Sequence, residues 1–383
     1  MTTFATVEGC VTILCFMIGV YGATGMLGRL LTDRFDRVGA PTMLIGRSQA
    51  ALSGLTKPDA PRPTSVASID DPAALERALD GCSVLVNCAP AEASGERLVR
   101  AALDAGIHYV DAAVAQQHIR SIFEKYDDEA TQCDVAVIPA LGFDYAIGDC
   151  LAHVAAQSRQ PASTVVIAYA IEGAEVTGNS ARAAATTAGP EVVYRDGRWR
   201  RVPLEFDRAW FEFPDPVGRR QMSRYGSGEV ITVPHHVQTQ SVITLITSTS
   251  LCPYPALLPV FPMIRPVVGL VRRTPARAIL GMIAAALGRR GPRTARNPPA
   301  DTRRSRDDRF MVVAEVHAKS GSIGGAAASG GNFHQVTAAI LAQGALWLAA
   351  GSVVAGVHSA ATAFEPHALL DSLASEGVTW SQS

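Results

Sequence analysis

The sequence lacks the spacing by which most metal and disulfide sites are recognised. Its seven cysteines are an odd number, and no two of them form a C-x-x-C pair or a cluster with histidine. Structural zinc sites need such spacing, and disulfide-stabilised secreted domains need paired cysteines. We therefore expect no metal ion and a reducing, cytoplasmic environment.

A strong charge of one sign is also missing. The chain has 34 Lys and Arg against 35 Asp and Glu, which leaves a formal net charge of −1. Because the net charge is close to zero, the chain has no general electrostatic attraction for nucleic acid, so we expect no nucleic-acid partner. What remains is a globular composition, 48% hydrophobic, and a length of 383 residues that suits two domains.

Two apolar regions raise the question of membrane contact. Residues 254–287 contain four prolines in their first half, which argues against one continuous membrane helix but leaves peripheral association open. Residues 334–357 are long and apolar, yet no basic flank anchors them, which favours a buried helix over membrane contact. Residues 1–16 have no evident structural role. They are either a native extension or a segment before the natural start at Met17, and cleavage as a signal peptide would damage the first strand.

From residue 17 to about residue 150, short apolar runs alternate with helical patterns. Leu27, Leu31 and Phe35 recur at helical spacing, and a later helix has Ser94 as its expected N-cap and Gly106 as its stop. The predicted strands are residues 17–22, 42–47, 64–70, 83–90, 108–113 and 135–142. Alternating strands and helices predict an α/β, Rossmann-type, doubly wound parallel sheet over 17–150.

The pattern changes after this region. Residues 151–332 predict a second α+β domain with a mixed sheet, and residues 333–383 predict a C-terminal helical segment that packs back on both domains. Asp196-Gly197 predicts a hairpin turn. If residues 229–237 form a strand, His235 and His236 point to opposite faces, which disfavours a shared metal ion.

Three glycines follow the first predicted strand. Gly22 permits a sharp turn, Gly25 permits close approach of a pyrophosphate to a helix N-terminus, and Gly28 permits tight packing of that helix on the strand. The spacing G-x-x-G-x-x-G is a variant of the dinucleotide-binding fingerprint, and its place between a strand and a helix is the required context. A purely structural glycine turn is the alternative.

The second predicted strand ends in Arg47 and Ser48, where a site for NAD would place an acid. An arginine can pair with a 2′-phosphate, so NADP(H) is favoured, unless Arg47 is only a solvated surface residue. Other strand ends should line the same crevice, including Asp70 and the Asn87–Pro90 segment. The expected cofactor-binding residues are Gly22, Ala23, Thr24, Gly25, Met26, Leu27, Gly28, Arg47, Ser48, Asp70, Asn87, Cys88, Ala89 and Pro90.

Three residues at later strand ends are candidates for catalysis. Asp111 would act as a general acid if burial raised its pKa, or else it caps a helix or bonds a loop. Asp144 is open to either role, and Tyr145 would donate a proton or simply pack at the domain junction.

The segments "GVYGATGMLGRLL", "LIGRS", "GERLVRAALDAGIHYVDAA" and "PALGFDYAIGD" resemble the saccharopine dehydrogenase-like oxidoreductases. The resemblance covers the N-terminal 150 residues well and is fainter in the closing segment. It implies an NADP-binding Rossmann domain, a substrate and dimerisation domain, a homodimer, and reduction or oxidation of C=N bonds, or of C=C bonds in the trans-acting enoyl reductases. The sequence departs from the family at Cys88-Ala89-Pro90 and at Tyr145–Gly148, so substrate identity cannot be carried over.

The sequence therefore predicts an NADP(H)-dependent oxidoreductase that reduces a C=C, C=N or C=O bond of a small or lipid-like metabolite. The apolar residues 254–287 slightly favour an enoyl reductase-like activity. The alternative is a catalytically inactive NADP-binding sensor or scaffold protein.

Overall fold

The structure is a computed structural model, and it describes residues 16–56, 62–157, 159–173, 191–202, 209–224, 226–251, 308–351 and 353–383. Residues 1–15 and the apolar residues 254–287 lie outside the described residues, and so do the predictions made for them.

The first half of the chain forms a parallel sheet with the strand order β15-β6-β5-β4-β1-β2-β3. Val20, Leu44 and Val84, from three neighbouring strands, are fully buried, as expected for strands that helices cover on both faces. The strands are β1 (Met17–Tyr21), β2 (Thr42–Gly46), β3 (Thr64–Val66), β4 (Cys82–Asn87), β5 (His108–Asp111), β6 (Ala136–Ile138) and β15 (Gly356–Val357). The predicted Rossmann-type sheet is confirmed.

Helices connect these strands. They are α1 (Met26–Val38), α2 (Gln49–Ser53), α3 (Pro72–Leu79), α4 (Ala91–Asp104), α5 (Gln116–Gln132) and α6 (Phe143–Ala156). Helix α4 begins at Ala91, so the prediction that Ser94 is its N-cap is wrong. The Ser94 hydroxyl instead donates to the carbonyl of Pro90 from within the first turn. Gly106, which follows the helix, has a φ of 64°, as a stop signal requires.

A mixed nine-stranded sheet forms the second half of the molecule. Strand β12 runs parallel to β7, whereas β13 pairs with β7 in the antiparallel sense. The strands are β7 (Ala162–Glu172), β8 (Glu191–Arg195), β9 (Arg198–Val202), β10 (Ala209–Glu212), β11 (Arg219–Arg224), β12 (Thr239–Thr247), β13 (Arg309–Ala318), β14 (Gly321–Gly331) and β16 (Thr379–Gln382). The predicted hairpin is confirmed, because Asp196 and Gly197 join β8 to β9 with φ of 54° and 68°.

Residues 229–237 do not form the predicted strand. They form α8 (Glu229–Thr232) and the 3₁₀ helix η1 (Val233–His235), and α9 (Ser248–Leu251) follows β12. Val230, Ile231 and Val233 are all buried, so the run has no polar face that would mark its period. A short apolar run of this kind does not distinguish a strand from a buried helix, and the argument that His235 and His236 face opposite sides of a strand falls with it.

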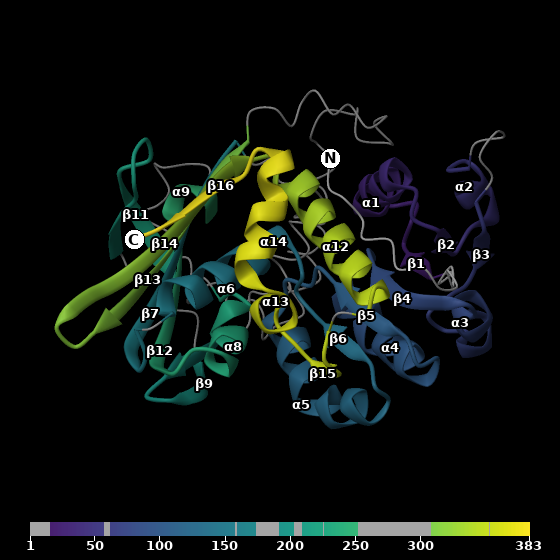
Figure 1. Cartoon of the computed structure of the whole chain (residues 1–383), viewed down its shortest axis with the longest axis horizontal. Coiled ribbons are helices and arrows are strands. Elements are labelled where there is room, and N and C mark those ends of the chain that lie inside the picture. Colours follow the sequence, from purple (N-terminus) through teal and green to yellow (C-terminus); the bar gives the residue numbers. More distant parts are fainter. Residues whose placement is uncertain are drawn as a thin grey trace, which may run out of the picture.

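The C-terminal segment joins the two sheets. It contains α12 (Phe333–Ala349), α13 (Ala360–Ala363), α14 (Pro366–Ser372) and η4 (Leu373–Glu376), and these helices lie between the sheets in Figure 1. It also adds β15 to the first sheet, beside β6, and β16 to the second, beside β14. The apolar residues 334–349 are thus part of α12, a helix largely buried inside the protein. Among the described residues, no helix has both the length and the apolar character needed to cross a bilayer.

Candidate functional site

The glycine turn lies between β1 and α1. Gly22 has a φ of 79°, which L side chains rarely adopt, and a Cβ at Gly28 would lie only 2.7 Å from the Cα of Ala23. The nearest atoms all belong to the backbone of Gly22 and Ala23, which cannot give way as a side chain can, so α1 packs on the turn only with glycine at position 28. Ala23 is fully buried beneath the turn, whereas Gly25 and Met26 are exposed above it.

The N-terminus of α1 has the properties of an anion site. Its N-cap is Gly25, no side chain caps the helix, and no acidic residue lies in its first turn. Helix N–H groups without such partners carry a partial positive charge that suits a phosphate or pyrophosphate. The residues present therefore fit the pyrophosphate of a dinucleotide.

The ends of β1, β2 and β3 meet beside this turn. The pKa of the buried Tyr21 hydroxyl is raised, mainly by burial, and both Arg47 and Asp70 act on it electrostatically. Arg47 and Asp70 thus face the same end of β1. Asp70 forms an exposed ion pair with Arg97 of α4, and the Ser48 hydroxyl accepts a hydrogen bond from the amide of Ala51 as the N-cap of α2.

Sequence reasoning missed a second arginine at the glycine turn. Arg29 Nε donates to the carbonyl of Thr24 over 3.0 Å, which places its guanidinium beside the turn. A basic residue directly after the last glycine was the signal available in the sequence.

The loop after β4 lies against the glycine turn. The amide of Cys88 donates to the carbonyl of Tyr21 over 2.9 Å, and a Cβ at Gly22 would lie 3.0 Å from the amide nitrogen of Ala89. Burial raises the pKa of the Cys88 thiol to about 12, so this cysteine is not a thiolate nucleophile at neutral pH. The two loops together form one edge of the crevice.

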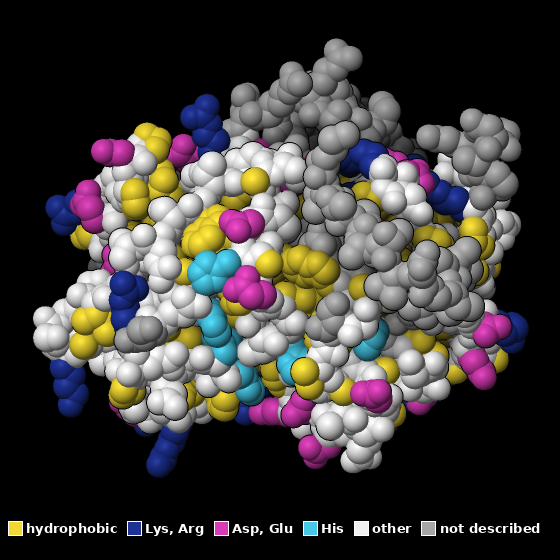
Figure 2. Space-filling model, viewed as in Figure 1, with side chains coloured by type: hydrophobic (Ala, Val, Ile, Leu, Met, Phe, Trp, Pro, Cys, Tyr) yellow, Lys and Arg dark blue, Asp and Glu magenta, His cyan; other side chains and the backbone are white. Residues whose placement is uncertain are grey.

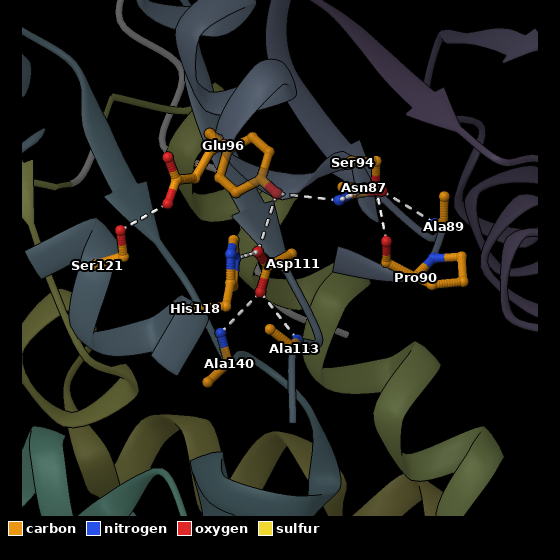
Figure 3. Close-up of polar contacts among 11 residues, drawn as sticks. Asn87, Ala89, Pro90, Ser94, Glu96, Asp111, Ala113, His118, Ser121 and Ala140 are labelled. Atoms are coloured by element: carbon orange, nitrogen blue, oxygen red, sulfur yellow. Dashed lines mark hydrogen bonds and ion pairs between the residues drawn. The ribbon is translucent and has the colours of Figure 1, made fainter. Parts of the chain in front are cut away.

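Asp111 lies beneath that edge and is completely buried. Its Oδ1 accepts hydrogen bonds from the amides of Ala113 and Ala140, both over 2.9 Å, as Figure 3 shows. Its Oδ2 accepts from the Tyr109 hydroxyl over 2.9 Å and lies 3.0 Å from Nε2 of His118. Burial works to raise the pKa of this carboxyl, but His118 and the two amides outweigh it and the pKa is lowered.

The premise for Asp111 as a general acid is therefore wrong, because the pKa of its carboxyl is lowered overall in spite of its burial. Its hydrogen bonds instead match the alternative weighed from the sequence, a carboxylate that holds loop backbone. His118, which the sequence analysis did not select, is a direct partner of Asp111. No local pattern marks that pairing, since it depends on how α5 packs on β5.

Tyr145 and Asp144 begin α6 but have different surroundings. Tyr145 is 2% exposed, and its hydroxyl donates to the carbonyl of Val114 over 2.7 Å. A Cβ at Gly228 would lie 2.6 Å from Cδ2 of its ring, so Tyr145 packs at the junction of the two halves. Asp144 is half-buried in the first turn of α6, and burial raises the pKa of its carboxyl to about 6. Of the three catalytic candidates, only Asp144 has both partial access to solvent and a pKa near neutrality.

Histidines also form a second polar cluster with a buried aspartate, and Figure 2 shows several histidine side chains on one face of the molecule. His236 Nε2 lies 2.8 Å from Oδ1 of the buried Asp149, and the Nδ1 atoms of His236 and His153 are 3.3 Å apart. Asp149 also accepts from the Thr232 hydroxyl and from the amide of Ala361. These bonds join α6 to α8 and to the C-terminal segment, so we interpret the cluster as structural.

Comparison with known proteins agrees with this geometry. Residues 18–141 match the family model of the saccharopine dehydrogenase NADP binding domain. The saccharopine dehydrogenase-like oxidoreductases of Bos taurus and Homo sapiens are each 26% identical over 148 residues, a match that covers 34% of this chain. The chain covers only 34% of the length of those relatives.

A solved structure extends the likeness in fold to the whole chain. The apo saccharopine dehydrogenase (L-Glu forming) of Saccharomyces cerevisiae superposes with a TM-score of 0.61, at 12% sequence identity. The superposition covers 96% of this chain and 99% of the yeast chain. The glycine turn and the family match together support a nicotinamide dinucleotide as the ligand of the crevice. Over residues 18–141 the chain is therefore similar to the NADP binding domain of saccharopine dehydrogenase and to the saccharopine dehydrogenase-like oxidoreductases.

Proposed function

We propose that this protein is an NADP(H)-dependent oxidoreductase that reduces a C=C, C=N or C=O bond of a small or lipid-like metabolite. The observation that carries the cofactor choice is the end of β2, where Arg47 is exposed beside Tyr21 and no acid follows the strand. A carboxylate there would repel a 2′-phosphate, whereas a guanidinium binds it with two parallel hydrogen bonds.

Different residues would bind the cofactor and donate the proton in the proposed reaction. The α1 N-terminus binds the pyrophosphate, and Arg47 and Ser48 bind the 2′-phosphate. NADPH held by these residues would supply a hydride, that is, the electron pair for one atom of the substrate double bond. Asp144, protonated below its pKa of about 6, supplies the proton that the other atom needs.

Hydride transfer is tested by NADPH oxidation against three sets of acceptors: imines formed from amino acids, enoyl thioesters and simple carbonyl compounds. We expect turnover with at least one set, and the preference for an enoyl compound follows only from the apolar residues 254–287 of the sequence. Turnover of polar imines alone would contradict that preference.

The role of Asp144 predicts a pH dependence. As a general acid it is active when protonated, so the turnover number should fall as pH rises through about 6. Asp144→Asn should lower the turnover number by about 10²- to 10⁴-fold and abolish this pH dependence. Asp104→Asn, an exposed aspartate at the end of α4, is the control and should behave as the wild type. An unchanged pH profile in Asp144→Asn would remove Asp144 from the mechanism.

A second candidate function is a binding protein without catalysis, a sensor or scaffold that holds NADP(H). The observation in its favour is that Asp111 and Tyr145 are both buried and fully engaged in contacts within the protein. It predicts tight NADPH binding with no oxidation by any acceptor.

Homodimer formation, a cytoplasmic location and weak peripheral membrane contact stay predictions from the sequence. They are tested by light scattering, by localisation of the tagged protein and by co-flotation with liposomes.

A further inference from the structure

A chain of buried side chains runs beneath the loop that follows β4. Asn87 ends β4 and donates from Nδ2 to the Tyr109 hydroxyl over 3.0 Å. Tyr109 donates in turn to Asp111, which is paired with His118 (Figure 3). Each of the four side chains is at most 8% exposed, so none of them is available to touch a ligand in the crevice.

One end of this chain fixes the loop itself. Asn87 Oδ1 accepts from the amide of Ala89 over 2.9 Å, and Asn87 Nδ2 lies 3.4 Å from the Ser94 hydroxyl. That hydroxyl donates to the carbonyl of Pro90 over 3.0 Å. Asn87 and Ser94 therefore hold the backbone of residues 88–90, the same loop that contacts the glycine turn.

The other end fixes the neighbouring strand ends. Asp111 binds the amide of Ala113 after β5 and the amide of Ala140 after β6. Ala140 has a φ of 60°, which is uncommon for a residue with a Cβ, and the bond to Asp111 helps to hold it there. The Asp111 carboxylate thus fixes the position of the backbone at the ends of β5 and β6. Through Tyr109 and Asn87 it also fixes the backbone at the end of β4.

His118 completes the chain and is itself held by a glycine. A Cβ at Gly95 in α4 would lie 2.7 Å from Nε2 of His118, so the imidazole occupies space that any other residue at position 95 would fill. His118 also contributes most among the groups that lower the pKa of Asp111. The carboxylate is therefore charged at neutral pH and accepts all of its hydrogen bonds strongly.

We propose that the chain Asn87–Tyr109–Asp111–His118 positions the nicotinamide half of the bound cofactor without touching it. This inference rests on the proposed function. The adenosine half belongs over the ends of β1 to β3, where Arg47 and Ser48 lie, so the nicotinamide half belongs over the ends of β4 to β6. The chain sets the backbone of those three strand ends, and Tyr109 at its centre is a positioning residue.

The test compares two ligands by titration calorimetry: NADPH and adenosine 2′,5′-bisphosphate, which contains only the adenosine half. Tyr109→Phe keeps the ring and removes both hydrogen bonds of the hydroxyl. We expect this variant to bind NADPH about tenfold more weakly and the bisphosphate as the wild type does. Arg47→Ala, by contrast, should weaken both ligands.

Two further variants keep the test decisive. Tyr126→Phe is the matched control, because Tyr126 is a buried tyrosine of α5 in the same domain and outside the chain of hydrogen bonds, and we expect it to bind both ligands normally. Ser94→Ala removes the bond to Pro90 at the end of the chain within a helix that accepts alanine. It should show the same selective loss to a smaller degree, and it replaces Tyr109→Phe if that variant does not fold.

The outcomes separate two failures. Suppose that the wild type binds both ligands. If Tyr109→Phe and Ser94→Ala then bind NADPH normally, or lose affinity for both ligands equally, the positioning role is wrong while the proposed function stands. If the wild type binds neither ligand, the proposed function is wrong and this inference falls with it. A lower unfolding temperature in Tyr109→Phe alone does not account for a loss confined to NADPH, so the ratio of the two affinities is the deciding quantity.

Discussion

At the scale of single residues, the glycine turn is the most constrained part of the site. A Cβ at Gly28 would lie within 3 Å of backbone atoms of Gly22 and Ala23, and this backbone cannot move without displacing β1 or α1. The same contact places the α1 N-terminus next to the end of β1, where the pyrophosphate is expected. The packing of α1 on the turn and the binding of a pyrophosphate therefore both require a glycine at position 28.

This contact predicts that Gly28→Ala loses cofactor binding. The added methyl group would force α1 away from the turn, and we expect at least a tenfold loss in NADPH affinity and a destabilisation of about 1–3 kcal/mol. Calorimetry and thermal unfolding measure the two effects. Gly54→Ala is the control, because Gly54 ends α2 with a φ of −69° and a Cβ there meets its nearest neighbour at 3.5 Å. Normal NADPH binding by Gly28→Ala would show that the turn is not the pyrophosphate site.

At the scale of elements, α8 carries a buried acid beneath α6. Glu229 is fully buried, and the Tyr169 hydroxyl donates to its Oε1. Burial raises the pKa of this carboxyl to about 8, against the opposing effect of the Ser227 and Tyr169 hydroxyls. Since the pKa in the unfolded chain is near 4.5, the folded protein holds one more proton between pH 4.5 and pH 8.

Stability should therefore fall as pH rises through this window, because the unfolded state releases the proton first. Glu229→Gln replaces the acid with a neutral amide and should remove up to about 1.4 kcal/mol per pH unit from the slope of unfolding free energy against pH. Urea unfolding at pH 5, 6, 7 and 8 measures the slope. Glu212→Gln, at an exposed position of β10, should leave it unchanged. A wild-type slope in Glu229→Gln would mean that Glu229 is ionised in the folded protein.

The elements also show how far the sequence alone predicts this site. The turn at Gly22 to Gly28 and the end of β2 were predictable because both are local patterns with a direct physical cause. The helical α8 was not, because the buried residues of 229–233 have no period. The sequence also did not predict the pairing of His118 with Asp111 or the insertion of β15 beside β6. Each depends on residues that meet only after the helices pack, in the case of β15 from a position more than 200 residues along the chain.

At the scale of the whole molecule, the residues that follow β5 lie where the two halves meet. Gln116, at the start of α5, donates from Nε2 to the carbonyls of Val192 and Ser227, over 3.0 and 2.9 Å, and accepts from the amide of Val192. The ring of Tyr145 packs on Gly228, and the C-terminal segment adds one strand to each sheet, so both connect the halves at further points. A ligand over the ends of β4 to β6 therefore lies next to the second sheet's domain, which is where a substrate would have to enter.

The central claim is that this crevice binds NADP(H) in preference to NAD(H) through Arg47. The measurement that tests it most directly is titration calorimetry of NADPH and NADH against the wild type, Arg47→Ala and the control Arg37→Ala, an exposed arginine in the last turn of α1. The account predicts at least about tenfold tighter binding of NADPH by the wild type and by Arg37→Ala, and loss of that preference in Arg47→Ala. Equal affinity for both cofactors in the wild type, or a preference that survives in Arg47→Ala, would contradict it.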